Sequence, residues 1–144
     1  MADGELKEAT TARRLLAALI ASAIELRLPE VDVNPNTNSP TSEEWRIVFR
    51  RFGALPFNHY SECFNPLVVP AEEPVVADLA DDLADIWRDL KTGLRNYEMG
   101  DIAAAEWTWY LNYSIHWGHH ATAALNAIQA WFSATGDDQE RDAV

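Results

Sequence analysis

Residues 77–99 read ADLADDLADIWRDLKTGLRNYEM, and residues 102–134 read IAAAEWTWYLNYSIHWGHHATAALNAIQAWFSA. In the first segment, apolar side chains recur every three or four residues, which places them on one face of a helix. These side chains are Leu79, Leu83, Ile86, Leu90, Leu94 and Tyr97. The pattern predicts a helix over residues 77–99. Gly100 supplies a left-handed cap for it, and Asp101 supplies an N-cap for a second helix over residues 102–134.

Aspartates follow the first helix with the same spacing, one residue out of step with the apolar side chains. They are Asp78, Asp82, Asp85 and Asp89. Because one residue corresponds to about 100° of rotation, this acidic row borders the apolar face rather than opposing it. Its first members suit the positive end of the helix dipole, but Asp89 lies more than a turn inside the helix. Like charges at this spacing repel, so a cationic or proton-donating partner would stabilise the row.

Histidines on the second helix are the expected partner of the acidic row. His116 and His120 are four residues apart and share one face of the helix. In an antiparallel hairpin, residues at equal distances from the link lie side by side. Asp85 lies 15 residues before the glycine of the link and His116 lies 16 after it, while Asp82 and His120 lie 18 before and 20 after. We therefore expect Asp82, Asp85 and Asp89 to lie level with the two histidines and to form a polar cluster.

Aromatic residues surround much of the second helix, so it should pack against several neighbours. Aromatic side chains at this density usually belong to the core, but some could instead stack on a ligand bound near the cluster. The candidates for such a pocket are Trp87, Trp107, Tyr113 and Trp117. Gly118, within the second helix, predicts a kink or the close approach of a neighbouring helix, and we favour close approach.

The segments before residue 77 predict three further helices, over residues 5–28, 42–52 and 56–64. An apolar stripe marks the first, a capping box of Thr41 with Glu44 begins the second, and Pro56 suits the first turn of the third. Residues 66–74 contain three prolines and predict an extended strap across the bundle rather than a strand. We expect one all-α domain over residues 1–144, a bundle of about five helices built on the long antiparallel hairpin.

Composition disfavours several classes of function. The formal net charge is −12, which argues against a nucleic-acid partner and against anionic membrane surfaces, because both attract basic proteins. The apolar run at residues 15–24 is about half of the ~20 residues that a membrane span needs, so we expect a core helix, with an export signal as the alternative. Cys63 is the only cysteine and excludes an intrachain disulfide, which suits a cytoplasmic protein.

Residues 81–120 also contain a recognisable pattern. DDLADIWRDLK at 81–91, WTW at 107–109 and HWGHH at 116–120 resemble D-D-L-x-D-I-Y-x-D-L-K, W-x-W and H-W-G-x-H of an uncharacterised bacterial family, domain of unknown function 5063. The resemblance implies an all-helical fold and assigns no activity. The pattern falls on Asp82, Asp85, Asp89, Trp107, His116, Trp117, Gly118 and His120. His119 falls on a variable position, and Trp87 replaces the usual tyrosine.

Three functions are open for the cluster, and the first is our working hypothesis. It is a buried histidine–aspartate network that fixes helix register in an interaction or scaffold protein with no cofactor. The alternative is a metal site in which His116, His120 and Asp85 bind zinc, manganese or iron, and an open position on the metal would support hydrolase-like chemistry. The third is a histidine, oriented by an aspartate, that acts as a general base in an aromatic pocket. Enzymatic activity, a protein partner and a homodimer all stay open.

Overall fold

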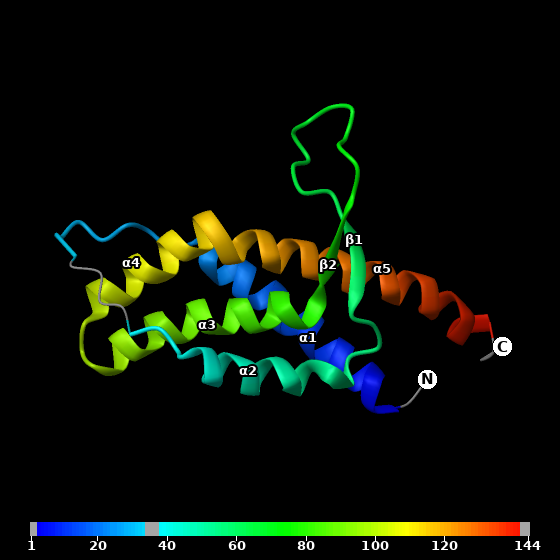
Figure 1. Cartoon of the computed structure of the whole chain (residues 1–144), viewed down its shortest axis with the longest axis horizontal. Coiled ribbons are helices and arrows are strands. Elements are labelled where there is room, and N and C mark those ends of the chain that lie inside the picture. Colours follow the sequence, from blue (N-terminus) through cyan, green and yellow to red (C-terminus); the bar gives the residue numbers. More distant parts are fainter. Residues whose placement is uncertain (1–2, 34–37, 142–144) are drawn as a thin grey trace.

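The computed structural model describes residues 3–33 and 38–141 (Figure 1). Its elements are α1 (Asp3–Ile24), α2 (Ser42–Arg51), a 3₁₀ turn (Phe52–Ala54), β1 (His59–Glu62), β2 (Val75–Asp78), α3 (Leu79–Glu98), α4 (Ile102–Asn112), a π-helical turn (Tyr113–Trp117) and α5 (Gly118–Arg141). The fold is mainly helical, as the sequence predicts, and one small antiparallel sheet joins β1 to β2. Within the described residues, no helix is both long and apolar enough to cross a bilayer.

The antiparallel hairpin of α3 with the α4–α5 rod is the centre of the fold. Asp78 caps α3, because its Oδ1 accepts a hydrogen bond from Asp81 N at 3.0 Å. Asp101 caps α4 in the same way, with its Oδ1 accepting from Ala104 N at 3.1 Å. Gly100 has a φ of +85°, the left-handed conformation expected of this cap. The predicted ranges 77–99 and 102–134 therefore correspond to α3 and to the rod, although a π turn interrupts the rod.

The two arms of the hairpin approach closely at Gly93 of α3. A Cβ atom at this position would lie 2.1 Å from the indole Nε1 of Trp109 on α4, so any side chain would displace the tryptophan. Trp109 Nε1 donates a hydrogen bond to Leu90 O at 3.0 Å, which holds the ring against α3. The glycine therefore sets the spacing of α3 and α4.

Gly118 has a different role from the one that we favoured. It directly follows the π turn Tyr113–Trp117, and a Cβ atom here would lie 2.4 Å from Tyr113 O of the same rod. The glycine thus accommodates the wide turn rather than the approach of a neighbouring helix. π turns are frequent at functional sites, and this one contains His116.

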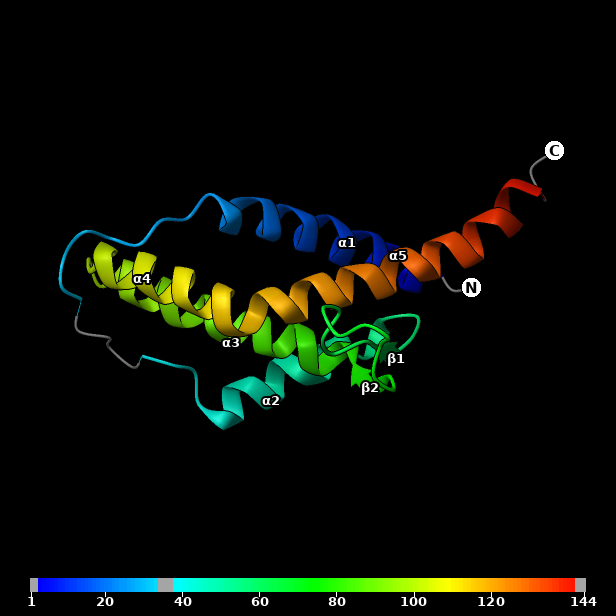
Figure 2. The ribbon, with the colours of Figure 1, turned by 90° about the horizontal axis from the view of Figure 1, so that it is seen from above.

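The helices α1 and α2 lie on different sides of the hairpin (Figure 2). α1 packs against α5, and α2 packs against α3. The largest buried apolar side chains of the core are Leu16 of α1, Leu79 and Ile86 of α3, and Trp117 and Ile128 of the rod. Burial contributes roughly 1.5–3 kcal/mol for each side chain of this size, so the core holds α1 against the hairpin.

The third predicted helix, over residues 56–64, does not form. Instead, Asn58 accepts hydrogen bonds from the first N–H groups of α3: its carbonyl from Leu79 N at 2.8 Å and its side chain from Ala80 N at 3.1 Å. This contact places β1 antiparallel to β2 at the start of α3. The open donors of a helix N-terminus therefore decide the conformation of this segment, and local periodicity does not reveal them.

Of the other expectations for the first half of the chain, one is confirmed and two differ from the structure. The capping box is confirmed, because Thr41 Oγ1 accepts from Glu44 N at 3.2 Å and Glu44 Oε2 accepts from Thr41 N at 2.7 Å. α1 ends at Ile24, earlier than the predicted residue 28. The strap over residues 66–74 was expected across the bundle, but all its residues are exposed in a loop that projects from the helices (Figure 1).

Candidate functional site

The acidic side of α3 faces the histidines of the α4–α5 rod. Asp82, Asp85 and Asp89 come from successive turns of α3, His116 from the π turn and His120 from the first turn of α5. The side chain of Asp82 is the deepest, at 5% exposed, and that of His116 is the most open, at 36%. The structure therefore brings together the five residues expected to meet, and we call them the Asp–His cluster.

Each histidine is held by one aspartate. His116 Nδ1 lies 2.6 Å from Asp89 Oδ2, and His120 Nδ1 lies 2.6 Å from Asp82 Oδ1. An ionised carboxylate only accepts hydrogen bonds, so each Nδ1 must bear a proton and donate it. In a neutral imidazole, this arrangement fixes the tautomer and leaves Nε2 with a lone pair.

The two Nε2 atoms face each other and a third aspartate. His120 Nε2 lies 3.2 Å from His116 Nε2. Asp85 Oδ2 lies 3.6 Å from His116 Nε2 and 3.9 Å from His120 Nε2. With both imidazoles neutral, three atoms with lone pairs converge and repel one another. A proton on one Nε2, or a cation between the three atoms, would remove this repulsion.

The dimensions of this triangle suit a metal ion. The point equidistant from the three atoms lies about 2.1 Å from each, within the range of zinc bonds to histidine and aspartate. Two imidazoles and one carboxylate are a donor set of zinc and of non-haem iron sites. Asp82 and Asp89 lie behind the histidines, where metal sites commonly have carboxylates that orient the imidazole rings.

Three further residues hold the aspartates in place. Trp45 Nε1 donates to Asp85 Oδ1 at 2.9 Å, and Arg88 contacts the same oxygen at 2.9 Å, which leaves Oδ2 as the oxygen toward the histidines. The Tyr60 hydroxyl donates to Asp82 Oδ2, the oxygen that His120 does not contact. The spacing of Arg88 from Asp85 is visible in the sequence, whereas Trp45 and Tyr60 come from α2 and β1, far along the chain.

Charge and burial shift several pKa values around the cluster. The hydrogen bond to Asp82 and the nearby carboxylates raise the pKa of His120, although burial of the ring opposes this effect. Burial, followed by the charge of Asp85, raises the pKa of Asp81. Burial and the contact with Asp82 raise the pKa of Tyr60, which keeps it a hydroxyl donor. The surroundings therefore favour an added positive charge, either a proton or a metal ion.

His119, which falls on a variable position of the family pattern, contacts a different element. Its Nε2 lies against the carboxylate of Glu62 in β1, and its ring meets Phe64 edge to face with centroids 5.4 Å apart. This contact links α5 to the strand that contains Tyr60. It therefore helps to position the tyrosine that donates to Asp82.

The four aromatic candidates for a ligand pocket are spread over the fold. Trp117 is buried in the core against Tyr113, with ring centroids 4.8 Å apart. Trp87 lines an apolar cavity between α1 and α3, and Trp107 is half-buried on α4. A cavity of about 380 Å³ that adjoins the cluster is lined by Trp45. A ligand-stacking role for the four candidates stays a prediction.

One solved structure resembles the chain in fold, and one family model matches its sequence. No curated protein matches the sequence. The crystal structure of protein BF1032 from Bacteroides fragilis is similar, with a TM-score of 0.65 and 20% identity, over 84% of this chain and 73% of that one. At this identity the similarity concerns the fold alone. The family model of a domain of unknown function, DUF5063, matches residues 7–133, and the chain therefore belongs to that family.

Proposed function

We propose that the Asp–His cluster binds one divalent transition-metal ion, with His116 Nε2, His120 Nε2 and Asp85 Oδ2 as its ligands. The main support is the convergence of these three atoms around a point about 2.1 Å from each. Helix register alone does not require this convergence. The histidines already donate through Nδ1, and Asp85 already accepts from Trp45 through its other oxygen.

Zinc suits these donors best. It binds histidine nitrogen and aspartate oxygen, and with three protein ligands it keeps a fourth position for water. Iron and manganese are alternatives, since two histidines and one carboxylate also form the ligand set of iron oxygenases. The partial exposure of His116 gives water a path to the open position. A metal-bound water there would supply Lewis-acid or hydroxide chemistry, the basis of a hydrolase-like activity.

In the absence of metal, the same geometry favours one proton shared by the two imidazoles. A proton on one Nε2 can be donated to the other across 3.2 Å, and the hydrogen bond from His120 to Asp82, which raises the pKa of His120, favours this protonated state. A metal ion must displace that proton, so metal affinity should increase with pH. The scaffold role with a purely structural network corresponds to this metal-free state.

Calorimetric titration of chelator-treated protein with zinc chloride tests the proposal. We expect one ion per chain. His116→Ala, His120→Ala and Asp85→Asn should each weaken binding by more than the roughly 10–100-fold that loss of an outer carboxylate costs. The controls are His59→Gln, at an exposed position of β1, and Asp101→Asn, where asparagine is an equally good N-cap.

Binding that persists in all three ligand variants would place the ion elsewhere and overturn the proposal. The proposal also fails if the treated protein binds no zinc and unfolds at the same temperature with and without chelator. The cluster would then be the structural network of a scaffold protein. Circular dichroism of each variant, recorded in chelator, checks that the loss of binding is not a loss of fold.

We further propose that this chain is a cytoplasmic protein of bacteria and that it does not bind nucleic acid. A single exposed cysteine, Cys63, suits a reducing compartment, and the net charge of −12 disfavours contact with phosphates. The similar solved structure comes from a bacterium. Fractionation of cells that produce the protein tests the location, and recovery in the periplasm would contradict it.

A further inference from the structure

A polar cavity of about 380 Å³ lies between α2 and α3, and we call it the α2–α3 cavity. The start of α2 contributes Thr41, Trp45 and Arg46 to its lining, and α3 contributes Asp81 and Asp85. The volume falls within the roughly 300–1,000 Å³ that is typical of small-molecule sites. In sites of this size, a few polar and charged groups orient the ligand and decide its chemical class.

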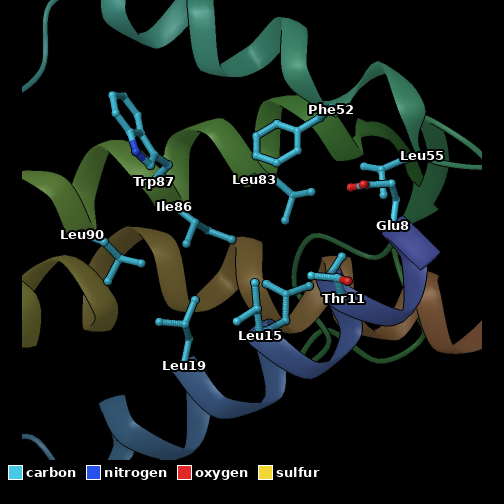
Figure 3. Close-up of a pocket in the computed structure, with 12 residues that line it drawn as sticks. Glu8, Thr11, Leu15, Leu19, Phe52, Leu55, Leu83, Ile86, Trp87 and Leu90 are labelled. Atoms are coloured by element: carbon cyan, nitrogen blue, oxygen red, sulfur yellow. The ribbon is translucent and has the colours of Figure 1, made fainter. Parts of the chain in front are cut away.

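Charge distinguishes this cavity from the apolar cavity between α1 and α3. Figure 3 shows mostly apolar side chains around the latter, and Glu8 is the one charged residue among the twelve that line it. In the α2–α3 cavity, four of the eight lining residues are charged, two with each sign. The α2–α3 cavity therefore gives the clearer indication of a ligand.

Two of these four charges satisfy each other. Arg88 contacts Asp85 Oδ1 at 2.9 Å, and the indole N–H of Trp45 donates to the same oxygen at 2.9 Å. The side chain of Asp85 is 14% exposed and that of Arg88 is 37% exposed, so this pair belongs to the contact between the two helices. The charges that are left for a ligand are those of Arg46 and Asp81.

Asp81 is a carboxylate without a cationic partner. Among the described residues, it forms no ion pair and its side-chain oxygens accept no hydrogen bond. The residue is half-buried, and burial, followed by the charge of Asp85, raises its pKa. An ammonium group beside Asp81 would offset both the burial and the repulsion, because it attracts the ionised carboxylate. Asp81 therefore provides a position for a cationic group of a ligand.

Arg46 supplies the opposite charge from α2. Its ion pair in the described part of the chain is with Glu43 of the same helix, at 3.5 Å, and the two side chains are 60% and 70% exposed. Exposed pairs of this kind contribute little, so the guanidinium is available to a ligand. Guanidinium groups bind carboxylates through two parallel hydrogen bonds. Within the described residues, Arg46 and Asp81 form no ion pair with each other, although both line the cavity.

We propose that the α2–α3 cavity binds a small zwitterion of the amino-acid type, with its ammonium group at Asp81 and its carboxylate at Arg46. A ligand with one charge would leave one of these residues unmatched, whereas a zwitterion matches both. Trp45 supplies an aromatic surface for the side chain of the ligand, and its hydrogen bond to Asp85 fixes the ring. A free amino acid and a short peptide both have the required charges.

The inference does not depend on the metal proposal. Asp85 is the one member of the Asp–His cluster that lines the cavity. The oxygen of Asp85 that contacts Arg88 is Oδ1, whereas Oδ2 is the proposed metal ligand. Binding of the zwitterion can therefore be measured in chelator, where a failure of the metal proposal does not change the result.

Calorimetric titration of the full chain with L-phenylalanine, in chelator, tests the proposal. Two fragments of the same size are the matched probes: phenethylamine lacks the carboxylate, and hydrocinnamate lacks the ammonium group. We expect the zwitterion to bind about tenfold or more tightly than either fragment, because each fragment loses one charge-assisted contact. A parallel titration with glycyl-L-phenylalanine distinguishes the source, since the tighter ligand of the two identifies an amino acid or a peptide.

Two variants assign the ends of the ligand. Asp81→Asn should weaken the binding of phenylalanine by about tenfold or more and leave that of hydrocinnamate unchanged. Arg46→Gln should weaken phenylalanine by a similar factor and leave phenethylamine unchanged. The controls are Asp101→Asn and Arg50→Gln, because both residues are exposed and neither lines the cavity. Thermal melts of both variants check that a loss of binding is not a loss of fold.

The proposal has definite points of failure. It is overturned if neither phenylalanine nor the dipeptide binds, or if a fragment with one charge binds as tightly as the zwitterion. It is also overturned if both Asp81→Asn and Arg46→Gln bind phenylalanine as tightly as the parent does. The opposite charges of the cavity would then be solvated surface groups.

Discussion

Replacing Asp82 with asparagine perturbs the orientation of His120 through a nearly isosteric change. Asp82 is 4% exposed, and its two oxygens contact one donor each, Tyr60 and His120. An asparagine amide offers one oxygen and one NH₂ group, so one of the two contacts must reverse. When the NH₂ group faces His120, Nδ1 becomes the acceptor and the proton moves to Nε2, the atom proposed to bind metal.

The size of the effect follows from the hydrogen bonds that change. A hydrogen bond to a charged group contributes about 1.5–3 kcal/mol, and asparagine replaces two of these with neutral ones. We expect Asp82→Asn to lower the free energy of unfolding of the metal-free protein by about 2–3 kcal/mol. Carboxylates that orient metal-bound histidines change metal affinity by about 10–100-fold, so zinc affinity should fall by a similar factor.

Urea denaturation followed by circular dichroism measures the first quantity, and calorimetric titration with zinc measures the second. Asp101→Asn is the matched control, because it removes the same charge at the other end of α3 and keeps a good N-cap. If Asp82→Asn leaves both the stability and the zinc affinity unchanged, Asp82 does not hold the proton of His120 on Nδ1, and this reasoning is refuted.

Three other predictions concern the charges around the cluster and the packing of the hairpin. The pKa of His120 is raised above the unfolded value of about 6.5, so its pairing stabilises the metal-free fold below that pH and the contribution is lost as pH rises through the folded pKa. Denaturation in chelator should show this loss in the parent but not in His120→Gln, and an identical pH profile would contradict it. The pKa of Asp81 is also raised, so its charge destabilises the fold at neutral pH. Asp81→Asn should raise the melting temperature at neutral pH and lose this advantage below about pH 4, and a lower melting temperature at neutral pH would count against it. Gly93→Ala should cost about 1–3 kcal/mol in urea denaturation, because its methyl group overlaps Trp109, whereas Gly53→Ala meets no atom within 4 Å. Equal stabilities of these two variants would exclude the spacing role of Gly93.

The hairpin and the meeting of aspartates with histidines could be predicted because both depend on local spacing. The apolar and acidic rows of α3 share one helical period, and the short link at Gly100 and Asp101 restricts the register. Counting from that link brings three aspartates level with two histidines. The structure has these side chains in contact.

The residues that support the cluster from other elements could not be predicted in the same way. Tyr60 lies in a segment with helical spacing, but the contact of Asn58 with the start of α3 makes the segment extended. Only then does the Tyr60 hydroxyl reach Asp82. Trp45 matches the apolar period of α2, and the partner of its indole N–H depends on how α2 packs on α3. The π turn before Gly118 likewise has no periodic signature.

The position of the ion itself is the most direct test of the metal site. Crystals grown with zinc and measured at the zinc absorption edge should show one anomalous peak, about 2.0–2.2 Å from His116 Nε2, His120 Nε2 and Asp85 Oδ2. Crystals with no peak there, in which the Nε2 atoms of His116 and His120 still lie within hydrogen-bond distance of each other, would contradict the account. The Asp–His cluster would then be complete without metal.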